Sequence, residues 1–211
     1  MDPKPSGRAA AAPTVYVIDD DPSIRELIAW LMKRESIPVH AFADARAFLD
    51  AYVPGAPGCL VLDLYLPGMS GLDLQRYLTE HGIGMPVIFL SARADVPQAV
   101  KAVKEGAIDF LEKPFDYRSM VALVHDCLRR DAEARERRRR TGEAAARLAS
   151  LTQREREVLE RVVAGKPNRV IAEELLISIK TVEAHRAKIM EKLGVDSVAE
   201  LVQTALSARG P

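Results

Sequence analysis

Two patterns of apolar residues divide the chain into an α/β half and an all-helical half. Between residues 14 and 128, short runs rich in β-branched residues alternate with segments whose apolar residues recur every three or four positions. The first pattern predicts buried strands, and the second predicts amphipathic helices. The predicted strands are Thr14–Asp19, Pro38–Phe42, Cys59–Leu64, Pro86–Ser91 and Ile108–Lys113. Because a helical pattern follows each of the five strands, we predict a doubly wound parallel sheet covered on both faces.

From about residue 148 the pattern predicts helices alone. Thr152 and Glu155 stand at the positions of a capping box, and Gly165 ends the helix that this box begins. Further helices are expected at about 169–175, 178–193 and 197–206. Two of these helices are joined by a short turn, and together they predict a helix-turn-helix at about 168–187. This half is therefore expected to be a four-helix, all-α domain.

Residues 129–147 (RRDAEARERRRRTGEAAAR) connect the two halves. Good helix formers dominate this stretch, but large apolar side chains are nearly absent, which excludes a coiled coil. It is either a solvated helical extension or a flexible linker, and Gly142 favours a break. The predicted organisation is a disordered tail (1–13), an α/β domain (14–128), a charged linker (129–147) and a helical domain (148–211).

Charge is unevenly distributed, although the 30 basic and 30 acidic residues cancel. Residues 14–126 carry a net charge of −6 and residues 127–147 a net charge of +4. Such asymmetry favours a nucleic-acid or phosphate role, and a plain solvated charge run is the alternative. No apolar run approaches the ~20 residues of a membrane span. Cys59 and Cys127 lack metal or disulfide spacing, and the tail lacks the features of a secretory signal, so we expect a cytoplasmic protein.

Polar side chains follow four of the predicted strands. Asp19 and Asp20 end the first strand, Asp63 lies in the third, and Ser91 and Lys113 end the fourth and fifth. In a doubly wound sheet these ends meet where ligands bind. Clustered carboxylates need a cation or a shared proton, and Mg²⁺ suits such a donor set. A carboxylate can also act as a nucleophile and form an aspartyl-phosphate.

These motifs resemble the receiver domain of two-component response regulators. The resemblance covers about residues 14–128, and residues 95–115 are especially similar to the FixJ branch. It implies that Asp63 accepts a phosphoryl group and that Asp19, Asp20 and Asp63 hold Mg²⁺ with the backbone carbonyl of Tyr65. It further implies that Lys113 pairs with the phosphoryl oxygens, that Ser91 moves to hydrogen-bond them and that Phe110 rotates inward. A cis Lys113–Pro114 bond is expected. The motifs that carry the resemblance are Asp19-Asp20, Asp63 with Pro67-Gly68-Met69-Ser70-Gly71, Ser91-Ala92 and Lys113-Pro114-Phe115.

Two other readings of the acidic cluster fit less well. A phosphatase of the haloacid dehalogenase type needs a second acid two residues after its nucleophile, where this chain has Tyr65. A flavodoxin-like cofactor binder needs a phosphate-cradling loop after the first strand, but Asp20 and Asp21 would repel phosphate. Neither reading accounts for the complete set of polar strand ends.

The second half resembles the LuxR-type DNA-binding domain, in residues 151–159, 165–172 and 177–186 and through Lys192-Leu193-Gly194. Pro167 stands where that family usually has a Ser or Thr cap, so Asn168 is expected to cap the helix instead. On a helical wheel, Val182, Ile189, Leu193 and Ile179 share a packing face. The remaining faces carry the candidate DNA contacts Lys180, Thr181, Glu183, Ala184 and Lys188, together with Arg186 nearer the packing face. A solvated helix face is the alternative.

Together the resemblances imply a NarL/FixJ-type response regulator, a phosphorylation-switched transcription factor rather than an enzyme. The implied partners are a sensor histidine kinase, promoter DNA and a second copy of the chain, with RNA polymerase as a further candidate and no membrane. The second copy would bind through the helix at 96–105 and the strand at 108–113, where Lys101, Lys104, Asp109 and Glu112 would make complementary charges. The alternative is a phosphorylation-insensitive regulator whose receiver serves only for dimerisation. The complete acidic pocket argues against that alternative.

Overall fold

A computed structural model gives the fold and describes residues 12–91 and 109–207. The chain divides into two compact units, Met1–Ala134 and Arg135–Pro211. Among the described residues, no helix combines the length and the apolar character that a membrane span requires. The finer domain bounds at 128 and 148 stay predictions.

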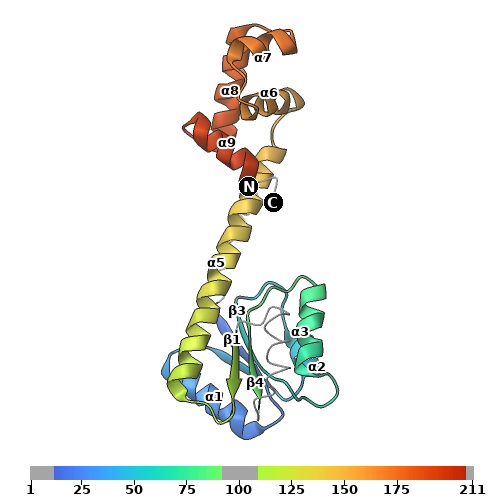
Figure 1. The fold of residues 1–211 in the computed structure, drawn as a ribbon, viewed down its shortest axis with the longest axis vertical. Coiled ribbons are helices and arrows are strands. Elements are labelled where there is room, and N and C mark those ends of the chain that lie inside the picture. The colour runs from blue at the N-terminus through green and yellow to red at the C-terminus, as the bar shows by residue number, and fades with distance from the viewer. Residues whose placement is uncertain (1–11, 92–108, 208–211) are drawn as a thin grey trace, which may run out of the picture. The chain divides into compact units, whose positions relative to one another are not determined.

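The first unit contains a parallel sheet (Figure 1) of five strands, and their order is β2-β1-β3-β4-β5. Since β2 lies on one side of β1 and β3 on the other, the strand order reverses at β1. The carboxyl ends of β1 and β3 therefore flank the switch point, where such sheets bind ligands. The predicted doubly wound sheet is confirmed. The strands are β1 (Thr14–Ile18), β2 (Val39–Phe42), β3 (Gly58–Asp63), β4 (Val87–Ser91) and β5 (Asp109–Glu112).

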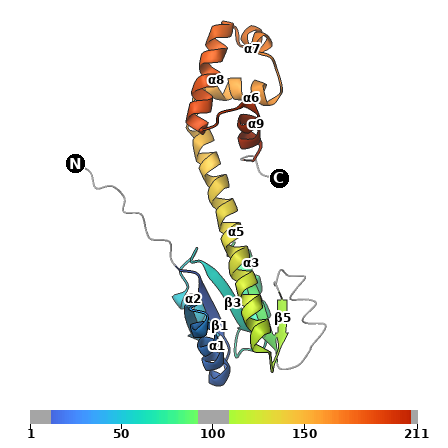
Figure 2. The same cartoon turned by 90° about the vertical axis from the view of Figure 1, so that its left-hand side faces the viewer.

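Helices cover both faces of this sheet (Figures 1 and 2). On one face, α1 (Pro22–Arg34) and α5 (Tyr117–Ala149) pack in a cluster that includes Val17 of β1. On the other face, α2 (Ala45–Ala51) and α3 (Gly71–Glu80) pack in a cluster that includes Ile18. Neighbouring residues of one strand thus enter opposite clusters, because strand side chains alternate. This is why β1 carries buried aliphatic or aromatic side chains on both of its faces from Val15 to Ile18. The helix predicted at 96–105 lies outside the described residues.

The long helix α5 contains the whole of residues 129–147. This stretch is therefore helical, and the break expected at Gly142 is wrong. In the first unit, the buried carboxylate of Asp131 accepts a hydrogen bond of 2.9 Å from the backbone N–H of Gly58, at the start of β3. In the second unit, Arg147 donates a hydrogen bond of 2.9 Å to the carbonyl of Leu193. Both ends of the stretch are thus held by specific contacts within their own units.

The described residues of the second unit form the end of α5 and four further helices around one core. Buried Val158, Ile171, Val182 and Leu201 each come from a different one of these four helices. The capping box of Thr152 and Glu155 is present. The second and third of the four, joined by residues 176–178, form the predicted helix-turn-helix. The helices are α6 (Gln153–Val163), α7 (Asn168–Leu175), α8 (Ile179–Leu193) and α9 (Val198–Ser207).

Candidate functional site

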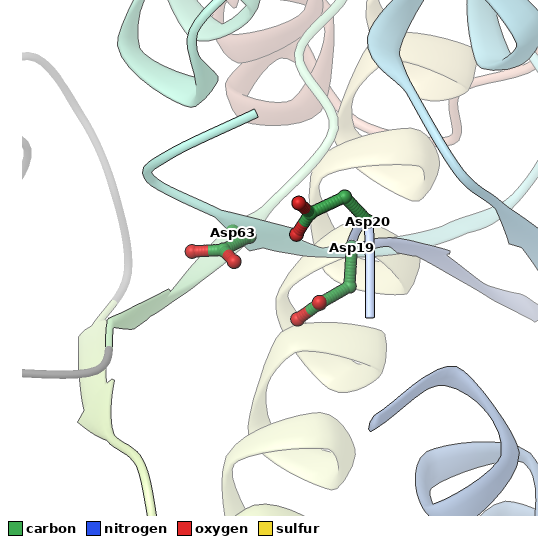
Figure 3. Close-up of side chains that lie close together, drawn as sticks. All are labelled: Asp19, Asp20 and Asp63. Carbon is green, nitrogen blue, oxygen red and sulfur yellow. The ribbon is translucent and has the colours of Figure 1, made fainter. Parts of the chain in front are cut away.

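Three carboxylates meet at the switch point of the sheet (Figure 3). Asp19 and Asp20 directly follow β1, and Asp63 is the last residue of β3. One oxygen from each of the three lies within 4.8 Å of the others. Asp19 is fully buried, Asp63 is 7% exposed and Asp20 is exposed. The structure thus brings together the three acids that the sequence placed at this edge.

Lys113 also belongs to the cluster. It directly follows β5, the strand at one edge of the sheet. Its Nζ donates hydrogen bonds of 2.6 Å to Oδ2 of Asp19 and 2.9 Å to Oδ2 of Asp63. The Lys113 N–H also donates to the carbonyl of Ser91 at 2.7 Å. The Lys113–Pro114 peptide bond is cis, as expected. One ammonium group therefore bridges the two buried carboxylates.

Burial and charge oppose each other in this pocket. Burial raises the pKa of Asp19 above its ordinary value, although the hydrogen bond from Lys113 acts to lower it. Burial alone would lower the pKa of Lys113, but its hydrogen bonds to Asp19 and Asp63 outweigh that effect and raise it. The protonated ammonium therefore remains in place between the two carboxylates.

The donor set of the pocket fits a divalent cation. One ammonium balances only one of the three carboxylates, so the four side chains keep two negative charges. Two carboxylates no more than 4.8 Å apart repel by at least about 3.5 kcal/mol at an effective dielectric constant near 20. Mg²⁺ prefers such hard oxygen ligands and completes its octahedron with water and phosphate oxygens.

The turn after β1 fixes the orientation of Asp19. Asp21 caps α1 by accepting from the N–H of Ser23 at 2.8 Å, and its own N–H donates to Oδ1 of Asp19 at 3.0 Å. The guanidinium of Arg25 donates to the backbone carbonyls of Asp19 and Asp20 at 2.6 and 2.9 Å. Sequence reasoning missed Arg25. The sequence feature that could have identified Arg25 is a basic residue in the first turns of the helix that directly follows the acidic residues.

Close backbone approach at Gly71 positions Asp63. A Cβ atom at Gly71 would lie 2.3 Å from the carbonyl oxygen of Asp63, closer than any real contact. The N–H of Gly71 donates to the carbonyl of Leu64 at 3.1 Å, and Ser70 caps the helix that begins there. From the sequence, Gly71 was part of a turn without a stated role. The structure shows why glycine is needed beside Asp63.

The two residues expected to sense the phosphoryl group, Ser91 and Phe110, lie on the neighbouring strands β4 and β5. Ser91 is the last residue of β4 and is fully buried. Phe110 of β5 is partly buried against the cluster that includes Ile18. The Tyr65 side chain is 55% exposed, and its N–H donates to Oδ1 of Asp63 at 3.3 Å. Asp109 and Glu112 are exposed on β5, whereas Lys101 and Lys104 lie outside the described residues.

The candidate DNA contacts lie on α8, the second helix of the helix-turn-helix. Ser178 caps α8 by accepting from the N–H of Thr181 at 3.1 Å, and Thr181 itself is partly buried. Figure 2 shows α6, α7 and α9 on one side of α8. The side chains exposed on α8 include Lys180, Glu183, Ala184 and Lys188.

Two expectations for this unit are wrong. Pro167 occupies the N-cap position of α7, and within the described residues no side chain caps that helix. The Asn168 side chain instead accepts a hydrogen bond from the guanidinium of Arg186, which ties α7 to α8. Ile179 was expected on the packing face but is 46% exposed. It is the first residue of α8, and the wheel does not register that a helix end can extend beyond the core.

Both units match known families. A model of the response regulator receiver domain matches residues 15–125, and a model of bacterial regulatory proteins of the luxR family matches residues 149–205. The transcriptional regulatory protein FixJ of Azorhizobium caulinodans is 46% identical over 194 residues, which are 92% of each chain. The transcriptional regulatory protein TdiR of Thauera aromatica is 42% identical over 90% of this chain and 84% of its own. Among solved structures, the response regulator StyR matches with a TM-score of 0.86 and 42% identity, over 93% of this chain and 99% of that chain.

Proposed function

The chain belongs to the response regulators that join a receiver domain to a LuxR-type DNA-binding domain, and we propose that phosphorylation of Asp63 controls its binding to promoter DNA. The supporting observation is the pocket itself, in which Asp19, Asp20 and Lys113 surround Asp63. Such a transcription factor is not an enzyme. It acts in the bacterial cytoplasm, where promoter DNA lies.

The phosphoryl donor is the phosphohistidine of a sensor histidine kinase. A carboxylate oxygen of Asp63 attacks the phosphorus, the new P–O bond forms, and the P–N bond to the donor imidazole breaks. The imidazole keeps the electron pair of that bond. Lys113, now 2.9 Å from Oδ2 of Asp63, turns to the incoming phosphoryl oxygens and balances part of their charge.

Asp19, Asp20, Asp63 and the backbone carbonyl of Tyr65 are the residues that would hold Mg²⁺. The bound ion supplies charge neutralisation for the transferring group. The carboxylate of Asp19 is already oriented for this role. Its Oδ1 accepts a hydrogen bond from the N–H of Asp21, and its Oδ2 accepts one from the ammonium of Lys113. Exposed Asp20 is free to adjust to the ion as it arrives from solvent.

Phosphorylation changes the surface around β5. Ser91 moves toward the phosphoryl oxygens, and Phe110 turns into the space that Ser91 leaves. The exposed Asp109 and Glu112 then meet Lys101 and Lys104 of a second copy, and the interface consists of residues 96–105, predicted to be a helix, and the predicted strand at 108–113. A shift from 1:99 to 99:1 between resting and active states requires ~5.5 kcal/mol. A charge-assisted contact to a phosphoryl group and one repacked aromatic ring together can supply energy of that order.

Dimerisation matters because one DNA-binding unit is expected to bind weakly. The exposed face of α8 carries Lys180 and Lys188 against Glu183, a net charge of only +1. Lys180, Glu183 and Ala184 would face base edges in the major groove, and Thr181, Lys188 and Arg186 would contact phosphates. Two units on half-sites one helical turn apart bind more tightly through effective concentration. RNA polymerase is the further partner that transcriptional output requires.

The first test is phosphoryl transfer from acetyl phosphate in the presence of Mg²⁺, followed by intact-mass measurement. The wild-type chain should gain the mass of one phosphoryl group. Asp63→Asn keeps the shape of the side chain but removes the nucleophile, so this variant should gain none. Equal labelling of the two chains would refute the assignment of Asp63.

The second test is sedimentation of the full chain with and without beryllofluoride. A monomer that becomes a dimer on activation supports the proposed switch. The alternative, a receiver that serves only as a phosphorylation-insensitive dimerisation module, predicts the same dimer in both states. If the activated chain stays monomeric at tens of micromolar yet gains DNA affinity, dimerisation is not the switch.

A further inference from the structure

An exposed isoleucine stands at the start of α8. Ile179 is 46% exposed, whereas Val182, Ile189 and Leu193 of the same helix are fully buried. Single exposed apolar side chains are common on protein surfaces. Exposure alone therefore does not indicate a function for Ile179, but its position on α8 does.

Ile179 opens the exposed face of α8. Residues four apart on a helix are neighbours, so the exposed side chains of α8 form two adjacent rows. Ile179, Glu183 and Ala187 form the first row, and Lys180, Ala184 and Lys188 form the second. Ile179 thus lies in line with Glu183 on the face assigned to DNA, at the border where that face meets the buried side of α8 at Val182.

The backbone around Ile179 is well held. The hydroxyl of Ser178 accepts from the N–H of Thr181 at 3.1 Å and lies 2.8 Å from the Thr181 hydroxyl. One residue earlier, the N–H of Ile177 donates to the carbonyl of Ala172 at 3.0 Å. Ile179 therefore lies at a capped helix end, and hydrogen bonds of the preceding turn hold the backbone there in place.

We propose that Ile179 packs against the C5-methyl group of a thymine in the major groove and so selects thymine at one position of each half-site. This inference rests on the proposed DNA-binding role of α8. The thymine methyl is the apolar group that base edges present in the major groove, and the first residues of a recognition helix approach those edges. Cytosine at the same position would place its amino group against the isoleucine without an acceptor.

The row to which Ile179 belongs also predicts where this thymine lies. Glu183 is one helical turn further along α8, a rise of ~5–6 Å, and base pairs stack ~3.4 Å apart along each strand. The thymine should therefore fall within about two base pairs of the position whose preference changes in Glu183→Ala.

Deoxyuridine substitution tests the contact, because it removes one methyl group from DNA and leaves base pairing intact. The probe is an operator duplex that the full chain, activated with beryllofluoride, selects from a randomised pool. Thymines are replaced one at a time. We expect about fourfold weaker binding at one position of each half-site, the effect of burying one methyl-sized group. Ile179→Ala should bind more weakly to the unmodified duplex and be indifferent to deoxyuridine at that position.

Leu176→Ala is the matched control, since Leu176 is an apolar side chain 92% exposed on the preceding turn. This variant should keep the wild-type pattern of deoxyuridine effects. The proposal is overturned if wild type ignores every substitution, if Ile179→Ala keeps the wild-type pattern, or if Leu176→Ala loses it. It is also overturned if Ile179→Ala lowers transcription with an unchanged pattern, which would assign Ile179 to a protein contact. In each of these cases the operator is still bound, so the proposed function stands. Failure to select any operator would refute both.

Discussion

Replacing Lys113 by methionine should destabilise the first unit in the absence of divalent cations. Lys113 lies 2.6 Å from Asp19 and 2.9 Å from Asp63. Without it, two largely buried carboxylates face each other within 4.8 Å, and they repel by about 3.5 kcal/mol at an effective dielectric constant near 20. Breaking a buried ion pair typically costs ~3–5 kcal/mol. We therefore expect a loss of about 3 kcal/mol in the free energy of unfolding.

Mg²⁺ should restore much of this loss. The variant pocket holds three carboxylates without an ammonium, so it should bind a divalent cation more tightly than the wild-type pocket. A ligand that binds the folded state stabilises it in proportion to the logarithm of its concentration relative to its Kd. The gain in stability on adding Mg²⁺ should accordingly be larger for Lys113→Met than for wild type.

Urea unfolding followed by tryptophan fluorescence measures both effects. Trp30 is the only tryptophan in the chain and lies on α1, so its signal reports on the first unit. Unfolding is measured in EDTA and again with Mg²⁺ present. Lys33→Met, at an exposed lysine of the same unit, is the control and should behave like wild type. Equal stability of Lys113→Met and wild type in EDTA, or equal gains on adding Mg²⁺, would refute the reasoning.

Three further predictions concern local structure. Leu176 adopts a left-handed conformation (φ 54°) and is 92% exposed, so Leu176→Gly should raise the unfolding free energy of the second unit by ~0.5–1 kcal/mol in thermal melts. Hydrogen bonds from Lys192 and the Thr152 backbone lower the pKa of Glu155 to about 2. The ionised carboxylate therefore stabilises the fold fully above its ordinary pKa of 4.5, and this stabilisation is lost as the pH falls toward 2. Glu155→Gln should accordingly lose less stability than wild type as the pH falls from about 4.5 to 2. Gly71→Ala should slow labelling by acetyl phosphate, because its Cβ would displace the Asp63 backbone.

Features set by local periodicity were predictable from the sequence. The strands, most helices and the convergence of Asp19, Asp63 and Lys113 follow from side-chain period and from the rule that parallel strands end at one edge. Arg25 and Gly71 were missed because their roles depend on distances between segments. Gly71 is significant only because the Asp63 carbonyl lies where its Cβ would be.

Errors arose at helix ends and in the charged stretch. The wheel placed Ile179 on the packing face, but a first-turn residue can lie beyond the core that its wheel angle points to. Asn168 was expected to cap α7, yet Arg186 of a helix further along the chain binds its side chain. Gly142 costs a helix only about 1 kcal/mol relative to alanine, too little to interrupt a helix anchored in both units by Asp131 and Arg147.

The affinity of the full chain for its selected operator, before and after treatment with acetyl phosphate and Mg²⁺, tests the central claim most directly. Intact mass measured on the same samples gives the extent of phosphorylation. Wild type should bind more tightly once phosphorylated, by about 5- to 150-fold if the coupling is of ordinary allosteric size, and Asp63→Asn should bind equally before and after. A phosphorylated wild-type chain with unchanged affinity, or an equal gain in Asp63→Asn, would contradict the account.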